Sequence, residues 1–259
     1  IRTFNSQQTL PLTLECLANQ TLPSVRYVIV DSGSKDKTLD ILPAGAVVHR
    51  YVGREFNYSE AINQGLEYVE TDYVFIISSH AFIIKRNAIE YALGLLEGNS
   101  NLGAAYFNLE VDGGPLTSGL IDKSNFDGQN GLWNWCSLIR MDLLKRRKFR
   151  PEVFSAEDQE WAGWLFNEEG KAIAHIANAG AINYNAKSHS FKKQRNEYVA
   201  IAYYTKRERL RWSNILGVLT SVVSPRGGLR PRQRGSQLIL AARLIGCRYS
   251  EPKAKSRYF

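Results

Sequence analysis

Two short, continuous apolar segments, each running directly into a polar cluster, constrain the fold of this chain most strongly. Residues 27–30 are followed by Asp31-Ser32-Gly33-Ser34, and residues 73–77 are followed by Ser78-Ser79-His80. An apolar run of this length that ends in turn-forming residues is typical of a strand buried on both faces of a parallel sheet. The sequence therefore predicts two central strands whose carboxyl ends carry polar side chains.

Helical and strand patterns alternate around these two segments. We predict further strands at residues 46–51 and 102–110 and helices at residues 10–19, 36–42, 59–67 and 87–97, with Ser59 as the N-cap of the third helix. We interpret the opening residues, Ile1-Arg2-Thr3-Phe4-Asn5, as the end of a strand whose first residues are missing. Strand–helix alternation at this spacing predicts a doubly wound α/β domain, which binds ligands at the carboxyl ends of its strands.

The pattern changes after residue 110. Residues 111–131 are rich in glycine and polar side chains and are expected to form a loop. We predict a helix at residues 157–168 and two short strands at residues 172–176 and 181–184. From residue 191 onward the sequence predicts basic helices.

Charge is divided unevenly along the chain. Residues 1–191 contain 17 Lys and Arg against 22 Asp and Glu, whereas residues 192–259 contain 16 against 3. Basic charge interleaved with aromatic and aliphatic side chains is typical of helices at a membrane interface. Nucleic acid would be attracted by the same charge, but the front of the chain offers no nucleic-acid-binding module. We therefore expect an anionic membrane surface as a partner of this tail and no nucleic acid, with a plain surface or an oligomer contact as the alternative.

Cysteine usage and hydropathy indicate the compartment. Cys16, Cys136 and Cys247 are odd in number, far apart and in no C-x-x-C pattern. This usage argues against a structural zinc site or a disulfide framework and favours a reducing compartment. No apolar run approaches the roughly 18–20 residues that a membrane-spanning helix needs. We expect a cytoplasmic protein that lies peripherally at the inner face of the membrane if its tail binds lipid.

The candidates for chemistry are titratable residues at strand and helix ends. Asp31 either accepts hydrogen bonds from a base or ribose or caps the following turn, and the sequence leaves both interpretations open. Glu157 and Asp158 open a predicted helix, where carboxylates also complement the helix dipole. His80 and His189 each follow a predicted strand, and a lone histidine is more often structural. No single one of these residues assigns a function.

Several motifs follow one another in a defined order. They are Arg2-Thr3-Phe4-Asn5, then Val30-Asp31-Ser32-Gly33-Ser34 with Asp36 and Thr38, then Phe56-Asn57-Tyr58-Ser59 with Ala61, Asn63 and Gly65. Residues 78–81, 133–149, 156–161 and 187–191 come next. In this order they resemble glycosyltransferase family 2, most closely its bacterial rhamnosyl- and mannosyltransferase-like members. The later segments match the family's D-x-D-type element, acceptor-side segment, E-D motif and closing histidine, so the resemblance covers about residues 1–191.

The resemblance implies a fold, a domain organisation and a reaction. The implied fold is GT-A (Rossmann-like) α/β, a mixed, mostly parallel sheet flanked by helices. Residues 1–191 form the glycosyltransferase domain, with a nucleotide-sugar-binding half at 1–110 and an acceptor and catalytic half at 111–191, and residues 192–259 form a basic helical extension. The reaction is an inverting sugar transfer in which Asp158 is the general base and Glu157 orients the acceptor or the base.

The resemblance also implies which residues contact the substrates. The expected donor contacts are Thr3, Phe4, Asn5, Asp31, Ser32, Asn63, Ser79 and His80, and the expected acceptor contacts are Trp135 and Trp161. The donor is a nucleotide-diphosphate sugar, for which the resemblance favours GDP-mannose or dTDP-rhamnose. The acceptor is a carbohydrate, a lipid-linked compound or another small hydroxyl compound.

One position departs from the family pattern. Ser78-Ser79-His80 stand where the family holds Mg²⁺ or Mn²⁺ through an aspartate. His80 and His189 together are candidate ligands of a softer ion such as Mn²⁺. Alternatively, the site works without metal and His80 or nearby basic residues donate to the phosphates, which we favour slightly. In a third interpretation, catalysis is lost and the chain is a glycosyltransferase-like binding or scaffold protein.

Overall fold

The computed structural model describes residues 1–22, 24–109, 114–184, 191–223 and 230–252. Its strands are β1 (Arg2–Thr3), β2 (Val28–Asp31), β3 (Val47–Arg50), β4 (Tyr73–Ile77), β5 (Ala81–Ile83), β6 (Leu102–Leu109), β7 (Thr117–Ile121), β8 (Cys136–Arg140) and β9 (Ala172–Asn183). Its α-helices are α1 (Leu10–Ala18), α2 (Tyr58–Leu66), α3 (Ala88–Gly98), α4 (Met141–Arg146), α5 (Glu157–Asn167), α6 (Phe191–Tyr204), α7 (Trp212–Val223) and α8 (Pro231–Cys247). Short 3₁₀ turns occupy Leu39–Ile41 and Arg207–Leu210.

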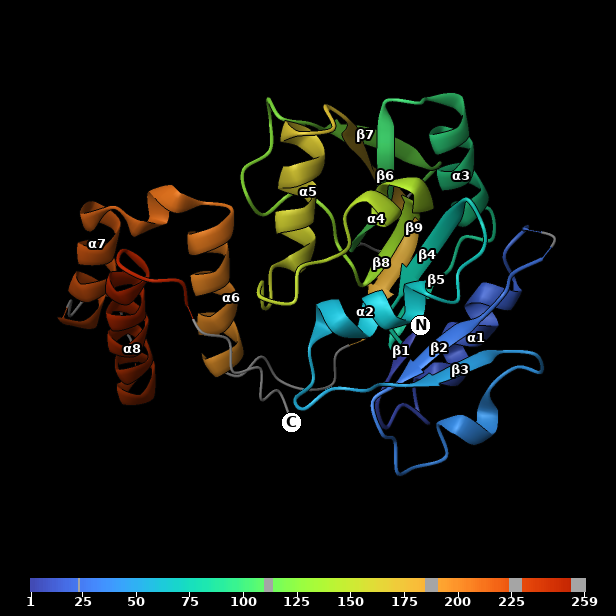
Figure 1. Cartoon of the computed structure of the whole chain (residues 1–259), viewed down its shortest axis with the longest axis horizontal. Helices are drawn as coiled ribbons and strands as arrows, with labels where there is room; N and C mark the ends of the chain where they lie inside the picture. Colours follow the sequence, from blue (N-terminus) through green and yellow to red (C-terminus); the bar gives the residue numbers. More distant parts are fainter. Residues whose placement is uncertain (23, 110–113, 185–190, 224–229, 253–259) are drawn as a thin grey trace.

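The strands form two sheets that meet at β1. A three-stranded parallel sheet has the order β1-β2-β3, and a six-stranded mixed sheet has the order β4-β8-β6-β9-β5, with β7 paired to β9. Within the mixed sheet β6 and β9 are parallel and the other pairs are antiparallel. A parallel bridge between Arg2 and Ser78 joins β1 to the end of β4. The predicted mixed α/β architecture is confirmed, with the parallel pairing concentrated in the N-terminal sheet (Figure 1).

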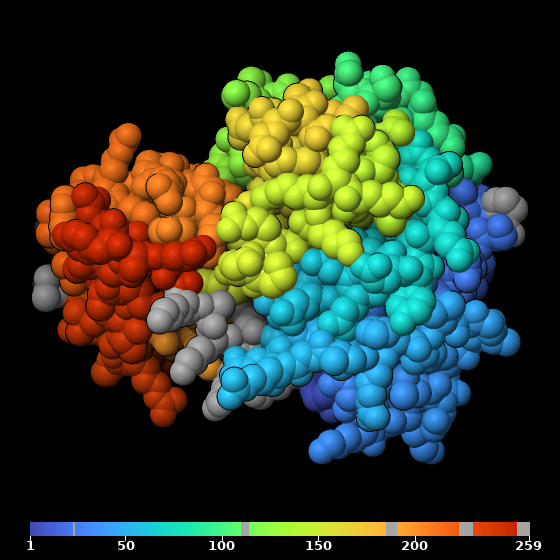
Figure 2. Space-filling model, viewed as in Figure 1, coloured from blue at the N-terminus to red at the C-terminus, as the bar shows by residue number. Residues whose placement is uncertain are grey.

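The mixed sheet carries helices on both faces, because side chains of its strands alternate between two cores. On β6, Tyr106 points into the core beneath α2, α4 and α5, whereas Phe107 points into the core beneath α1 and α3. A third core holds α6, α7 and α8 together and includes Phe154 from the segment before α5. Figures 1 and 2 show these three helices gathered beside the α/β body.

Three local predictions differ from the structure. The expected loop at residues 111–131 contains strand β7, because Leu120 and its neighbours pair with β9. The two strands expected at 172–176 and 181–184 are one bent strand, β9. Asn178 and Gly180 there both adopt φ of 63°, and the register against β6 shifts at this bend. The helix expected at 36–42 is reduced to a 3₁₀ turn.

The predicted N-cap of α2 is also wrong. The cap is Asn57, whose side-chain oxygen accepts from the backbone N–H of Glu60 at 3.2 Å. Ser59 is buried instead and donates its hydroxyl to the carbonyl of Arg150 at 2.9 Å. The two candidate caps lie two residues apart in the sequence, and the tertiary partner of Ser59 decides between them.

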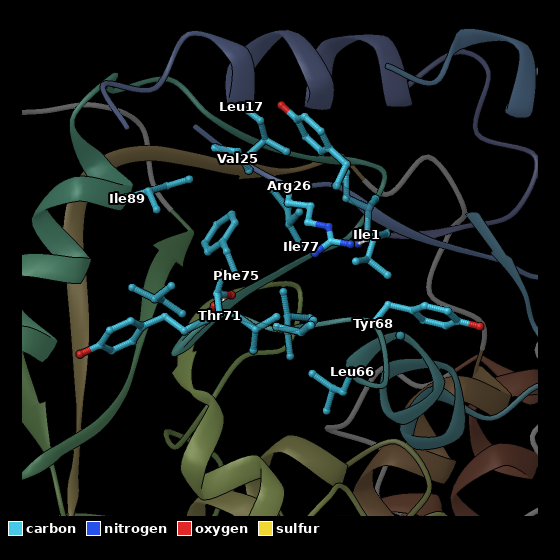
Figure 3. A pocket seen from close by; sticks show the side chains of 18 of the residues that line it. Ile1, Leu17, Val25, Arg26, Leu66, Tyr68, Thr71, Phe75, Ile77 and Ile89 are labelled. Carbon is cyan, nitrogen blue, oxygen red and sulfur yellow. Dashed lines mark hydrogen bonds between the residues drawn. The ribbon is translucent and has the colours of Figure 1, made fainter. Parts of the chain in front are cut away.

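A cavity of about 540 Å³ lies between β2 and β4. Its walls are mainly apolar and include Val28, Phe75, Ile77 and Ile89, as Figure 3 shows for several of them. The residues predicted to bind substrate do not line this cavity. Arg2, which also belongs to the candidate site described below, lines this cavity as well.

Candidate functional site

The end of β2 is organised by the carboxylate of Asp31. Asp31 is 2% exposed, and its Oδ2 accepts from the backbone N–H groups of Gly33 and Ser34 at 2.9 Å each. Its Oδ1 accepts from the hydroxyl of Thr3 at 3.0 Å and from that of Ser34. Of the two interpretations of Asp31, the structure shows the turn-capping contacts. Contact with a nucleobase stays a prediction.

The turn after β1 is held against the turn after β2. The backbone N–H of Asn5 donates to the Ser34 hydroxyl, and Asn5 Oδ1 accepts from the backbone N–H of Lys35, both at 2.8 Å. Asn5 adopts a left-handed backbone with φ of 48°, which Asn tolerates better than most residues. Ser32 is half-buried and donates its backbone N–H to the carbonyl of Thr3 at 2.9 Å. These contacts place Thr3, Asn5, Asp31 and Ser32 together, and half-buried Phe4 lies between Thr3 and Asn5. That these residues contact a donor stays a prediction.

The end of β4 lies against the same edge. The hydroxyls of Ser79 and Ser6 are 2.7 Å apart, and the backbone N–H of Ser79 donates to the carbonyl of Arg2 at 3.3 Å. His80 is half-buried, and its carbonyl accepts from the backbone N–H of Tyr184 at 2.8 Å. The carboxyl ends of β1, β2 and β4 therefore form one polar edge, where ligands bind in sheets of this kind.

The predicted carboxylate pair begins helix α5. Glu157 is 6% exposed and Asp158 is half-buried. Asp158 Oδ2 accepts from the backbone N–H of Asn134 at 3.2 Å, and its Oδ1 accepts from the N–H of Gln159 at 2.8 Å. Ala156 at the N-cap position provides no side-chain cap. The acidic side chains therefore satisfy and complement this helix end themselves.

Burial and mutual repulsion shift the proton affinity of this pair. Burial, and then the negative charge of Glu157, raise the pKa of Asp158 to about 8. Burial also raises the pKa of Glu157, and the positive charge of Arg2 opposes that rise. Two adjacent carboxyls that resist simultaneous ionisation share a proton near neutral pH. Such a pair is suited to accept a proton from a hydroxyl group.

The structure adds Arg2, Tyr58 and Asn134 to the site. Arg2 Nη2 donates to the carbonyl of Asn134 at 3.1 Å and to the Ser78 hydroxyl at 3.4 Å. The Arg2 guanidinium carbon lies 5.3 Å from the centre of the Tyr58 ring. The sequence signal for Arg2 is a charged side chain within a short buried strand. Asn134 carries no comparable sequence signal.

Two predicted substrate contacts are not brought to this site. Trp161 is fully buried in the core beneath α5, and its indole N–H donates to the carbonyl of Arg147 at 2.9 Å. It therefore presents no surface to an acceptor. The amide of Asn63 is used in two hydrogen bonds with the backbone of Phe149, at 2.7 and 3.2 Å. These bonds tie α2 to the segment before α5, so Asn63 acts within the fold.

Trp135 lies next to the polar edge. It is half-buried, and its carbonyl accepts from the backbone N–H of Ser78 at 3.0 Å. Its ring lies 6.4 Å from that of Trp133, centre to centre. Trp133 was not among the predicted contacts, although it lies on the other side of Asn134. An acceptor contact at Trp135 stays a prediction.

The predicted metal ligands are described only in part. His189 falls outside the described residues, so a His80–His189 pair stays a prediction. Among the residues that the structure describes, no group of three or more His, Cys, Asp or Glu side chains is arranged to hold a metal ion. The hydroxyls of Ser78 and Ser79 are engaged by Arg2 and Ser6. Whether His80 takes part in metal binding therefore stays a prediction.

The family model described as "Glycosyl transferase family 2" matches residues 1–150 of the chain. The chain belongs to this family. The match includes the polar edge and the segment up to Arg150, and it confirms the family expected from the motif order.

A curated relative of this family-2 chain is the poly(ribitol-phosphate) beta-N-acetylglucosaminyltransferase TarP of Staphylococcus aureus (strain N315). The two are 27% identical over an alignment of 190 residues, and the match covers 66% of this chain and 58% of TarP. This chain thus spans less than two thirds of the relative's length.

Solved structures share the fold. S. aureus TarS, 17% identical, matches 95% of this chain and 52% of that chain with a TM-score of 0.56. The 1–349 form of TarS in complex with UDP-GlcNAc, also 17% identical, matches 97% of this chain and 80% of that chain with the same score. A mannosyltransferase of Pyrobaculum calidifontis in complex with GDP-Man and Mn²⁺, 15% identical, matches 98% of this chain and 74% of that chain, again with a TM-score of 0.56. The GT-A fold implied by the resemblance is therefore confirmed.

Proposed function

We propose that this family-2 chain transfers a sugar from a nucleotide-diphosphate sugar to a hydroxyl acceptor, with inversion and with Asp158 as the general base. The observation that carries the proposal is the Glu157–Asp158 pair. It lies at the start of α5 and is connected through Asn134 and Arg2 to the carboxyl ends of β1 and β4. A base next to a nucleotide-binding edge is what a direct displacement at the anomeric carbon requires.

The proposed reaction involves only the two substrates and the Asp158 carboxylate. The acceptor oxygen forms a bond to the anomeric carbon while the bond from that carbon to the diphosphate oxygen breaks. The acceptor proton passes to an Asp158 oxygen, and the nucleoside diphosphate leaves with the electron pair of the broken bond. A pKa of about 8 makes the carboxylate of Asp158 a stronger base than an ordinary aspartate.

We propose UDP-GlcNAc as the first donor to test. Its support is the sequence similarity to TarP, which is named as an N-acetylglucosaminyltransferase, and the fold similarity to TarS in complex with UDP-GlcNAc. GDP-mannose, favoured together with dTDP-rhamnose by the sequence, has the support of the fold similarity to the GDP-Man complex. The acceptor proposed from the name of TarP is a polyol-phosphate chain. The excess of basic residues in 192–259 would attract such an anionic polymer.

A thermal-shift panel tests the donor. UDP, GDP and dTDP and their sugar conjugates are each measured with Mn²⁺ and with EDTA, since a ligand that binds only the folded state raises the melting temperature. We expect the largest shift with UDP-GlcNAc. A larger shift with GDP-mannose or dTDP-rhamnose would identify that compound as the donor instead. No shift with any compound of the panel would favour the scaffold interpretation. A shift that requires Mn²⁺ would support a metal site that includes His80.

A further inference from the structure

Helix α8 has apolar side chains on two opposite sides. On one side Leu240, Leu244 and Cys247 are buried in the third core, against α6 and α7. The other side is exposed, with Leu238 at 51% and Ile239 at 50%. Its residues recur at helical spacing and are all small or apolar, and they are called the outer face of α8 below: Gly235, Leu238, Ile239, Ala242 and Gly246. The packing of the helices uses the first side, so the outer face is open to a partner.

Arginine is the one charged residue type in the sequence of α7, α8 and their connection. Residues 212–250 contain six Arg and no Asp, Glu or Lys. Three of these side chains, Arg230, Arg232 and Arg234, are exposed and stand at the start of α8. Positive charge at this end of a helix opposes the helix dipole, and the first turn of α8 has no acidic residue to balance it. The stability of the helix therefore does not explain these arginines, whereas an anionic partner does.

The outer face belongs to a helix at one end of the molecule. α8 packs against α6, α7 and the 3₁₀ turn at Arg207–Leu210, and Figure 1 shows α6 between the α/β body and the other two helices. Just after α8, Arg248 donates to the Leu210 carbonyl and lies over the ring of Trp212, 4.8 Å from its centre. Trp212 is 47% exposed. Arginines thus stand at both ends of α8, and at one end an exposed indole accompanies them.

We propose that the outer face of α8 docks on an anionic lipid bilayer. Leu238 and Ile239 enter the apolar layer, and the arginines at the two ends of the helix lie at the level of the lipid phosphates. Burial of apolar side chains and attraction of arginines to anionic headgroups act together in such an interface. The proposal concerns a surface of the chain and does not depend on the reaction proposed above.

Two other partners match the outer face less well. A second copy docked by the same face would bring its arginines against those of the first copy, and residues 212–250 contain no acidic side chain to pair with them. A soluble polyanion would pair with the arginines but would leave Leu238 and Ile239 in water, without the gain from apolar burial. An anionic bilayer satisfies both kinds of side chain.

Co-sedimentation with vesicles tests the proposal. Vesicles of equal parts phosphatidylglycerol and phosphatidylcholine are compared with vesicles of phosphatidylcholine alone. The proteins are the wild-type chain, the double variant Leu238→Gln/Ile239→Gln and the triple variant Arg230→Gln/Arg232→Gln/Arg234→Gln. We expect the wild-type chain to prefer the anionic vesicles, and each variant to bind them at least about tenfold more weakly. The matched control is Val48→Gln/Leu120→Gln, because these two residues are similarly exposed on the α/β body.

The two variants separate the possible outcomes. Weaker vesicle binding in both, with an unchanged control, supports a lipid surface. Unchanged binding in the double variant and loss in the triple variant would overturn the proposal and assign the arginines to soluble polyanions. Binding of inorganic polyphosphate would then be lost in the triple variant as well. A wild-type chain that does not bind anionic vesicles would overturn the proposal outright.

A tryptophan placed on the outer face tests which surface enters the bilayer. Leu238→Trp and the control Leu120→Trp are each mixed with anionic vesicles whose acyl chains carry bromine, which quenches tryptophan fluorescence within the apolar layer. We expect more quenching than in the wild-type chain for Leu238→Trp and no increase for Leu120→Trp. Equal quenching in the two variants would show that another surface faces the lipid.

Discussion

The side chains of Trp161 and Asp31 both make their contacts with other residues of the folded chain. Trp161 is 0% exposed and donates its indole N–H to Arg147, and Asp31 accepts from two backbone N–H groups and two hydroxyls. Motif order places both residues at the right position along the chain. It does not report how much surface or hydrogen-bonding capacity remains for a ligand, because burial is fixed by residues far away in sequence.

Replacing Trp161 with Ala is expected to destabilise the fold without a specific effect on acceptor binding. Removal of a fully buried Trp costs about 3–5 kcal/mol, and this change also leaves the Arg147 carbonyl without its donor. Urea unfolding measures the loss, with the exposed Trp212→Ala as the matched control. A Trp161→Ala variant of normal stability whose KM for the acceptor rises would restore Trp161 as a substrate contact.

The raised pKa of Asp158 predicts how the stability of the fold depends on pH. The pKa of Asp158 is raised in the folded state, so the folded chain holds this proton more tightly than the unfolded chain does. Stability is therefore lost as pH rises from the ordinary Asp value through about 8, and the loss is complete only above that pH. Asp158→Asn lacks this loss and should be more stable than the wild type at pH 9, with a smaller difference at pH 5.

Urea unfolding at the two pH values measures this difference. Asp142→Asn is the control, because Asp142 is exposed on α4. An Asp158→Asn variant whose advantage is equal at both pH values would show that Asp158 is not a carboxyl of raised pKa.

At the scale of elements, local patterns were sufficient for the central strands and most helices. β4 and the helices around it follow from apolar runs and helical spacing at the predicted positions. β7 and the continuity of β9 did not follow, because their pairing joins residues 117–121 to residues 173–177. The location of the candidate site at strand ends could also be predicted, because polar residues directly follow the apolar runs that form β2 and β4. The contribution of Arg2 and Asn134 could not be predicted, because it depends on a hydrogen bond between residues 132 positions apart in the sequence.

The short strand β1 leaves neighbouring strand edges facing the apolar cavity. Arg2 is paired with Val30 and bridged to Ser78, and the cavity continues between β2 and β4 beyond Ile1. The amino group of Ile1 is buried there, and burial lowers its pKa to about 5. Four valines added before Ile1 should continue β1, pair with both neighbours and fill the cavity with apolar side chains.

We expect this extension to raise the melting temperature by about 5 °C or more. A Gly-Ser-Gly-Ser extension is the matched control, because it also converts the buried amine to an amide but offers no apolar side chains. Equal melting temperatures for the two extended chains would show that the cavity does not accept a strand.

At the scale of the whole molecule, the apolar residues of the basic tail are divided between core and surface. Leu240 and Leu244 are buried in the core of α6–α8, while Trp212, Leu216, Leu238 and Ile239 are exposed. No helix in the described part of the chain is long and apolar enough to cross a membrane. Binding to an anionic membrane surface therefore stays a prediction, next to the proposed binding of an anionic acceptor.

Charge reversal on the tail distinguishes these two partners. The triple variant Arg207→Glu, Arg211→Glu and Arg232→Glu should raise KM for a ribitol-phosphate oligomer at least about tenfold, since contacts to phosphate supply most of such affinity. It should leave KM for a short uncharged acceptor unchanged. The control carries the same charge change on the α/β body, at Arg26, Arg86 and Lys123, all of which are exposed.

Unchanged KM in the triple variant would exclude the tail as the site of acceptor binding. Co-sedimentation with anionic and with neutral liposomes is measured on the same proteins. Loss of binding to anionic liposomes without any change in KM would assign the tail to the membrane.

The most direct test of the central claim is sugar transfer by Asp158→Asn, measured alongside donor binding. The variant keeps the size of the side chain and removes its capacity to accept a proton, so transfer should fall by about 10²–10⁴-fold. The melting-temperature shift caused by the donor should stay close to that of the wild type. A variant that transfers sugar at the wild-type rate would contradict the assignment of Asp158 as the base.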